Sequence, residues 1–102
     1  MMELKPGSRW KGVGGAEFVV VRPPKKVESL QSGGHPVQPA AEAANPALQP
    51  EAELSDVLAV GKRYSDDTSG LELLVSKAGK GTLIVDGRVM GLKETKALPA
   101  SD

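Results

Sequence analysis

The sequence predicts an all-β fold, either a small antiparallel sheet or a partly open barrel of five to six strands. Residues 17–22 form a run rich in β-branched side chains, which favour strands. Asp86 and Gly87 separate two apolar runs, and an Asp-Gly pair in that position is typical of a tight hairpin. No stretch repeats its apolar residues with the period of a long helix. Because an open sheet of this size would expose its edges, we expect it to curl toward a barrel.

The N-terminal half contains two candidate strands. Residues 17–22 form the first, which ends at Pro23 and Pro24 because proline cannot donate to a strand ladder. Residues 27–31 form a shorter second strand, which the turn-forming sequence Ser-Gly-Gly-His-Pro at residues 32–36 brings to an end.

The C-terminal half is predicted to be a three-stranded meander. Its first strand, residues 71–77, places three apolar side chains on the face expected to join the core, and Glu72 and Ser76 on the opposite face. The three core positions are Leu71, Leu73 and Val75. A glycine-rich turn then leads to strands at residues 82–85 and 88–92.

Two segments between the strands are harder to interpret. Residues 61–64 are interpreted as a further strand, and residues 55–60 are left open because their apolar side chains do not alternate. Residues 38–54 are rich in Ala, Pro and Glu, a composition unable to bury itself, and are interpreted as a mobile loop or linker. A short helix at residues 39–44 is the alternative. Residues 1–102 thus form a single β domain, and we expect its last residues, 97–102, to fray.

Composition excludes several classes of function. The 13 basic residues are matched by 13 acidic ones, whereas a protein that binds nucleic acid needs surplus Lys and Arg. No apolar run approaches the roughly 20 residues that cross a bilayer, and no secretory leader is recognisable, so we expect no membrane association and a cytoplasmic location. Because Cys is absent, disulfides, thiolate chemistry and the usual zinc sites are also absent.

Motifs that resemble reactive sites have simpler explanations. The glycine-rich loop at residues 12–15 precedes a strand rather than a helix, so it lacks the context of a phosphate-binding loop. His35 is the only imidazole, and the sequence offers no group that would orient it for catalysis. Carboxylates at Asp66, Asp67 and Glu72 fit a solvent-facing turn better than a cation site. We therefore predict no catalytic residue, no cofactor and no metal.

Basic residues of the two N-terminal segments would form a patch if those segments adjoin, although scattered solvated charge is the favoured interpretation. These residues are Lys5, Arg9, Lys11, Lys25 and Lys26.

Trp10 is the most informative of the three aromatic residues. It is either the largest side chain of a small core, which we favour, or an exposed anchor for a partner. The residues predicted as possible partner contacts are Trp10, Arg22, His35 and Tyr64.

Three stretches resemble a group of small, largely uncharacterised bacterial proteins, some of which lie beside genes of acyl-CoA metabolism. The stretches are residues 4–11, residues 19–22 with 33–36, and residues 61–64 with 70–74. They cover both halves of the chain but not the Ala-, Pro- and Glu-rich segment. The resemblance implies a shared fold and a shared partner.

Other members of that group carry cysteines where this chain has none. The corresponding positions here hold Gly14 or Gly15, Ser32 and Val75. If the cysteines of the group bind a metal, this chain has lost every thiolate ligand, which argues against a metal function here.

The sequence as a whole favours a non-catalytic β module that binds a protein partner, with a second copy of the chain as one candidate for that partner. The unpaired backbone groups of an exposed strand edge suffice for such binding, which suits a chain poor in reactive side chains. The alternative is a small-molecule-binding protein or accessory enzyme with a pocket near residues 33–36. A degenerate relative of a Cys metal-binding protein is the remaining alternative.

Overall fold

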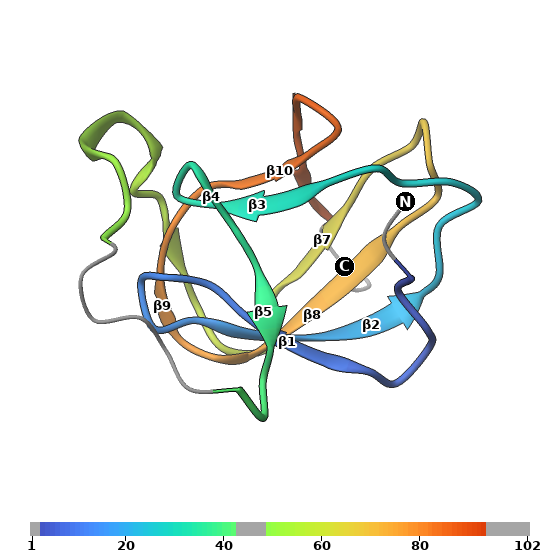
Figure 1. The fold of residues 1–102 in the computed structure, drawn as a ribbon, viewed down its shortest axis with the longest axis horizontal. Helices are drawn as coiled ribbons and strands as arrows, with labels where there is room; N and C mark the ends of the chain where they lie inside the picture. The colour runs from blue at the N-terminus through green and yellow to red at the C-terminus, as the bar shows by residue number, and fades with distance from the viewer. Residues whose placement is uncertain (1–2, 43–48, 94–102) are drawn as a thin grey trace, which may run out of the picture.

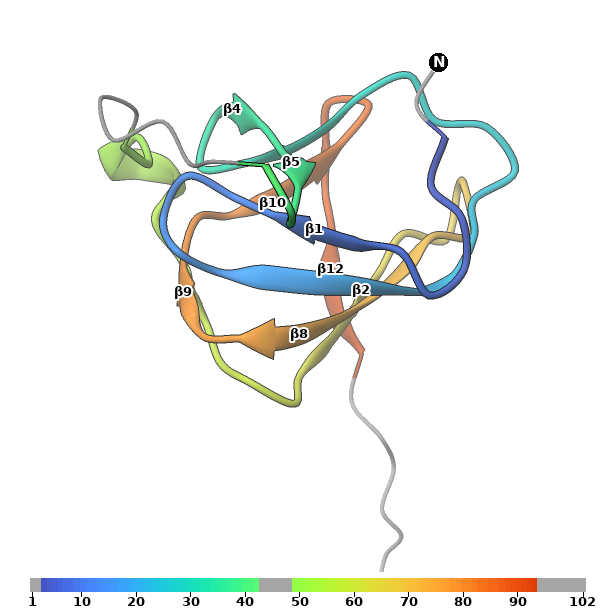
Figure 2. The ribbon, with the colours of Figure 1, turned by 60° about the horizontal axis from the view of Figure 1, so that its bottom comes forward.

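The computed structural model describes residues 3–42 and 49–93, and it is all-β (Figure 1). The largest sheet has six antiparallel strands in the order β12-β7-β8-β2-β1-β5. Its strands are β1 Arg9–Lys11, β2 Glu17–Arg22, β5 Gln38–Pro39, β7 Arg63–Ser65, β8 Glu72–Lys77 and β12 Gly91–Lys93. Figure 2 shows β1, β2 and β8 side by side in that order.

A four-stranded antiparallel sheet of order β11-β10-β3-β4 and a two-stranded sheet of β6 and β9 complete the described fold. Their strands are β3 Leu30–Ser32, β4 His35–Pro36, β6 Val57–Leu58, β9 Gly79–Lys80, β10 Leu83–Val85 and β11 Arg88–Val89. One turn of 3-10 helix, η1, spans Ala52–Leu54.

Two bent segments contribute strands to both larger sheets. Val37 separates β4 from β5, and Met90 separates β11 from β12. Both residues are buried, and each adds one backbone hydrogen bond to the four-stranded sheet. The Val37 amide donates to the Leu30 carbonyl at 3.1 Å, and the Met90 amide donates to the Leu83 carbonyl at 2.9 Å. Strands that change sheets at such bends form corners. The sheets are therefore linked at two corners without closing into a barrel.

The core lies between the two larger sheets, with β3 and β10 on one side and β2 and β8 on the other (Figure 1). Its largest fully buried side chain is Phe18 of β2. The other buried apolar residues are Leu4, Ala16, Val20, Val27, Leu30, Val37, Leu58, Leu71, Leu73, Val75, Leu83, Val85 and Met90. The prediction that Leu71, Leu73 and Val75 share a buried face is thus confirmed.

The hairpin expected at Asp86 and Gly87 is present between β10 and β11. Asp86 has φ 48° and Gly87 has φ 82°, the positive values that a tight hairpin turn requires. The Asp86 carboxylate also accepts hydrogen bonds from the amides of Glu28 and Ser29, each at 2.8 Å. The hairpin therefore holds the end of the loop that leads into β3.

The three-stranded meander predicted for the C-terminal half is wrong in its pairing. β8 pairs with β2 and β7, whereas β10 pairs with β3 and β11. Gly79 and Lys80 form β9 instead of a simple turn, and they carry the chain from one sheet to the other. Gly79 packs so closely on Ala16 that a Cβ there would lie 2.7 Å from the Ala16 Cα.

Other predicted boundaries shift by a few residues. The second strand begins at Leu30 instead of residue 27, and Val27 is buried in the preceding loop. Gly61 adopts φ 87° in a turn, so the strand expected at residues 61–64 is Arg63–Ser65.

The segment interpreted as a mobile linker has structured ends. Gln38–Pro39 pairs with β1, and Ala52–Leu54 forms the helical turn. The Glu51 amide donates to the Gly33 carbonyl at 2.9 Å, which ties the second end to the loop between β3 and β4. The middle of the segment, residues 43–48, and the tail expected to fray, 97–102, lie outside the described residues.

Candidate functional site

The four predicted contact residues lie on four different strands, three in the six-stranded sheet and one in the four-stranded sheet. Trp10 of β1 is half-buried and packs against the core, and its indole N–H donates to the Ser8 hydroxyl at 3.1 Å. Tyr64 of β7 is also half-buried; burial, and secondarily the charge of Asp56, raises the pKa of its phenol. Trp10 is therefore neither a fully buried plug nor a free anchor.

Arg22 and His35 lie in different sheets. Arg22 ends β2 with its side chain exposed, and its Nε lies 4.0 Å from a carboxylate oxygen of Glu72. His35 is half-buried in β4, where it is the register partner of Ser32. Ser32 is fully buried, and its hydroxyl donates to the Gly81 carbonyl at 2.9 Å. The hydroxyl of this register partner is thus engaged in a structural hydrogen bond.

Residues 33–36, where the alternative interpretation placed a ligand pocket, are covered by another part of the chain. A Cβ on Gly33 would lie 2.8 Å from the Pro50 Cβ, and one on Gly34 would lie 2.7 Å from the Glu51 carboxyl carbon. Pro50 and Glu51 therefore pack directly on this loop.

The positions at which the sequence resemblance led us to expect cysteines are buried or closely packed. Ser32 and Val75 are buried, and a Cβ on Gly14 would lie 2.7 Å from the Lys80 carbonyl carbon. In the part of the chain that the structure describes, no group of three or more His, Cys, Asp or Glu side chains is arranged to hold a metal ion.

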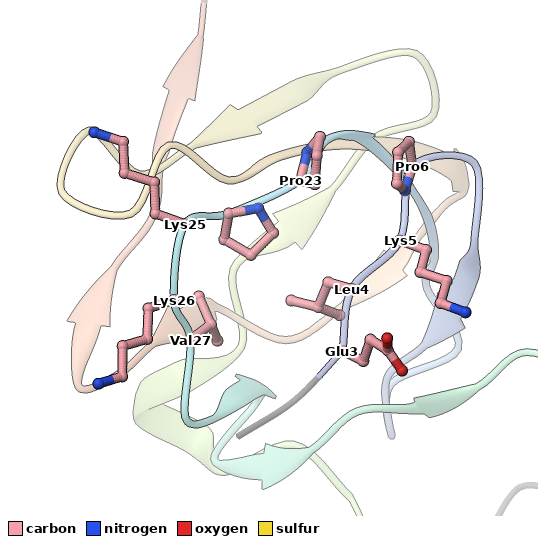
Figure 3. Close-up of a pocket in the computed structure, with 9 residues that line it drawn as sticks. Glu3, Leu4, Lys5, Pro6, Pro23, Lys25, Lys26 and Val27 are labelled. Carbon is pink, nitrogen blue, oxygen red and sulfur yellow. The ribbon is translucent and has the colours of Figure 1, made fainter.

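A concave site on the described surface lies where two N-terminal segments meet (Figure 3). We call it the proline-walled hollow. It has a volume of about 230 Å³ and is lined by Glu3, Leu4, Lys5, Pro6, Pro23, Pro24, Lys25, Lys26 and Val27. The side chains of Leu4 and Val27 point toward one another across its floor (Figure 3). These two residues belong to the core, so the hollow is a place where the core approaches solvent.

Backbone hydrogen bonds hold both walls of the hollow in place. Beside the first wall, the Gly7 amide donates to the Val20 carbonyl at 2.8 Å. On the second wall, the Lys25 amide donates to the Ser69 carbonyl at 2.8 Å. The three prolines restrict their own φ angles. The shape of the hollow is therefore formed before any ligand arrives.

The rim of the hollow is cationic. Lys25 and Lys26 point outward on one side and Lys5 on the other (Figure 3), while Glu3 is the single carboxylate. Within the described residues, none of the three ammonium groups forms an ion pair. The structure thus gathers three members of the basic patch that sequence analysis considered, whereas Arg9 and Lys11 lie on β1.

The hollow itself is not evident in the sequence. The signal was the similar composition of two short segments, residues 3–6 and 23–27, each of which combines Pro, Lys and one apolar side chain. Only the folded structure, in which the segments before and after β2 are held by backbone hydrogen bonds, shows that the two segments face each other.

The polar side chains around Asp66 form a cluster whose role is structural. Arg88 of β11 donates from Nη2 and Nε to the two carboxylate oxygens of Asp66, at 2.8 and 3.2 Å. The Ser69 amide and hydroxyl donate to the same carboxylate at 3.0 and 2.7 Å. The bond with Arg88, above all, lowers the pKa of Asp66 to about 2. This ion pair fastens β11 to the turn that precedes β8.

The fold and the hollow define a small all-β protein with a preformed, cation-rimmed depression. Comparison with protein-family models, with curated proteins and with solved structures gave no match. Within the described residues, no helix has the length and apolar character needed to cross a membrane.

Proposed function

We propose that this protein is a non-catalytic β module that binds a protein partner, and that the partner docks at the proline-walled hollow. The observation that carries this proposal is a preformed apolar depression whose floor, Leu4 and Val27, is continuous with the core.

The size of the hollow favours a protein side chain over a small molecule. Pockets for small molecules and cofactors have volumes of roughly 300–1,000 Å³. The hollow, at about 230 Å³, is smaller than this range and is open to solvent, so it suits one apolar side chain of a partner. Anchors of this kind supply most of the binding energy of many protein interfaces.

The rigidity of the walls also supports binding. Association loses free energy whenever a loop must be ordered. Here Gly7 and Lys25 are already fixed through their amides, and Pro6, Pro23 and Pro24 limit the remaining motion.

The buried position of Ser32 supports a non-catalytic role. A nucleophile must be accessible to its substrate and within reach of a base. Ser32, the register partner of His35, is sealed in the core by Gly12 and Gly81.

Position-specific photo-cross-linking tests the proposal. A benzophenone amino acid is placed at Lys26, on the rim, or at Lys62, an exposed control position in a turn before β7. After irradiation in a lysate of the source cells, we expect one protein to be cross-linked from position 26 and not from position 62, and to bind the purified chain with defined stoichiometry. Identical adducts from both positions, or no adduct from position 26, would contradict the proposal.

A further inference from the structure

We infer that the hollow takes an acidic protein segment with one apolar side chain, which inserts between Leu4 and Val27 while flanking carboxylates meet the lysines of the rim. This inference rests on the proposed function, because it specifies the chemistry of the partner at the same site.

The charge around the hollow is local. The whole chain carries equal numbers of basic and acidic residues, yet the hollow is lined by three lysines and one glutamate. Lys5, Lys25 and Lys26 are all exposed, and none of them is neutralised by a carboxylate within the described residues. An approaching segment therefore meets positive charge, which attracts carboxylates and repels Lys and Arg.

The positions of the lysines define where the acidic residues belong. Lys5 lies on one side of the Leu4 and Val27 floor, and Lys25 and Lys26 lie on the other (Figure 3). Side chains two residues apart in an extended segment share a face, so acidic residues at the second position before and after the inserted side chain come within reach of flexible lysines. The matching segment thus has an apolar residue with Asp or Glu on either side.

Lysine also determines the kind of recognition. Its ammonium is a flexible point charge without the planar fork with which arginine holds a carboxylate. Exposed pairs of this type contribute little individually and weaken with salt. The apolar side chain therefore provides the anchor, and the lysines select for acidic surroundings.

Defined peptides test the inference. The probe is a fluorescein-labelled peptide with the core Glu-Asp-Leu-Asp-Glu, and its binding is followed by anisotropy and by changes in the amide NMR spectrum of the ¹⁵N-labelled chain. We expect shifts confined to residues 3–6 and 23–27, and binding that weakens as sodium chloride rises from about 0.05 to 0.5 M. Replacing the peptide's Leu by Ser, or its acids by the amides, should each weaken binding by about tenfold.

A matched pair of charge reversals provides the control on the protein side. The variant Lys25→Glu/Lys26→Glu should bind the acidic peptide about tenfold more weakly. The variant Lys62→Glu/Arg63→Glu changes two adjacent exposed cations away from the hollow and should bind it as the parent does. Circular dichroism checks that both variants remain folded.

The outcomes separate this inference from the proposed function. If the amide peptide binds at the hollow as tightly as the acidic one, the preference for acids is refuted while docking at the hollow stands. If no peptide shifts residues of the hollow and position 26 yields no cross-link, both are refuted. Lysine-dependent binding to phosphatidylserine vesicles without peptide binding, or a concentration-dependent dimer that buries the hollow, would replace the acidic peptide by another occupant and overturn the inference.

Discussion

At the residue scale, Asp66 is the clearest case of a side chain whose ionisation supports the fold. Its carboxylate is buried, and it accepts bonds from Arg88 and from the amide and hydroxyl of Ser69. These bonds favour the charged form, so the pKa falls from an ordinary value of 3.8 to about 2. Because the unfolded chain binds the proton more tightly, the ion pair stabilises the fold above about pH 4, and this stabilisation is lost as the pH falls from about 4 toward 2.

We predict that Asp66→Asn lowers the free energy of unfolding by about 1 to 2 kcal/mol at pH 7, a figure reduced from the full pKa shift because Arg88 is partly exposed to solvent. The difference between variant and parent should shrink as the pH approaches 2. Urea unfolding at a series of pH values measures it. Asp67→Asn, at the exposed neighbouring carboxylate, serves as the control. An Asp66→Asn difference that is independent of pH would refute this role of the ion pair.

Also at the residue scale, the Asp86 side chain takes the place of a backbone carbonyl as the hydrogen-bond acceptor for two amides that are distant in the sequence. Its carboxylate accepts from Glu28 and Ser29 while its own φ is positive. Asp86→Ala removes the acceptor and places a poorly suited residue in this conformation, so we expect a loss of about 2 kcal/mol. Asp86→Asn keeps an acceptor oxygen and tolerates positive φ, and should lose less. Thermal unfolding of the two variants distinguishes them, and equal losses would show that the bonds to Glu28 and Ser29 contribute nothing.

At the element scale, β9 is the crossing between sheets, and its position depends on a glycine. Gly79 lies so close to the backbone of residues 15 and 16 that no side chain fits between them. The next residue, Lys80, forms bridges with Gly14 and Gly15 and pairs with Val57 of β6. This close approach explains why the glycine-rich turn of the sequence became a strand that leaves β8 instead of a hairpin that returns to it.

We predict that Gly79→Ala destabilises the protein by roughly 1–3 kcal/mol, because the backbone of Ala16 cannot move aside as a flexible side chain would. Gly91→Ala is a matched control, since a Cβ there would meet nothing within 4 Å and the residue does not have a positive φ. Chemical denaturation compares the two. Equal stability of the Gly79 and Gly91 variants would contradict the packing at this crossing.

At the scale of the whole molecule, one core joins the sheets, and few large side chains fill it. Phe18 of β2 lies opposite Trp10 of β1 and Val75 of β8 in the sheet register and is fully buried. Aromatic residues supply the largest apolar surfaces in a core. With only three aromatic residues in 102, the protein has little to compensate for the loss of one.

We predict that Phe18→Ala costs about 3–5 kcal/mol, a large share of the roughly 5–15 kcal/mol that stabilises a domain. The melting temperature should fall by many degrees, and the fluorescence of Trp10 should shift to the red as its packing loosens. Val60→Ala, at an exposed apolar residue, should leave both unchanged. A Phe18 variant that melts like the parent would show that the core does not depend on this side chain.

The amino-acid sequence by itself determined the local structure of this protein. A β-branched run specifies the strand at residues 17–22. Alternation specifies the strand at residues 72–77 and places Leu71, Leu73 and Val75 in the core, and an Asp-Gly pair specifies the hairpin at Asp86. Each of these depends on a few neighbouring residues, so pattern and turn chemistry suffice.

The tertiary structure alone decided which strands pair and which segments meet. β8 pairs with β2, 50 to 60 residues away, and the two segments that wall the hollow face each other because the Gly7 and Lys25 amides bond to Val20 and Ser69. Which strand pairs with which depends on backbone groups that are nearly the same in every residue and on how apolar faces distant in the sequence fit together. No local sequence pattern therefore predicts the pairing. The chemistry of the hollow, with apolar residues below and lysines at the rim, therefore exists only in the folded chain.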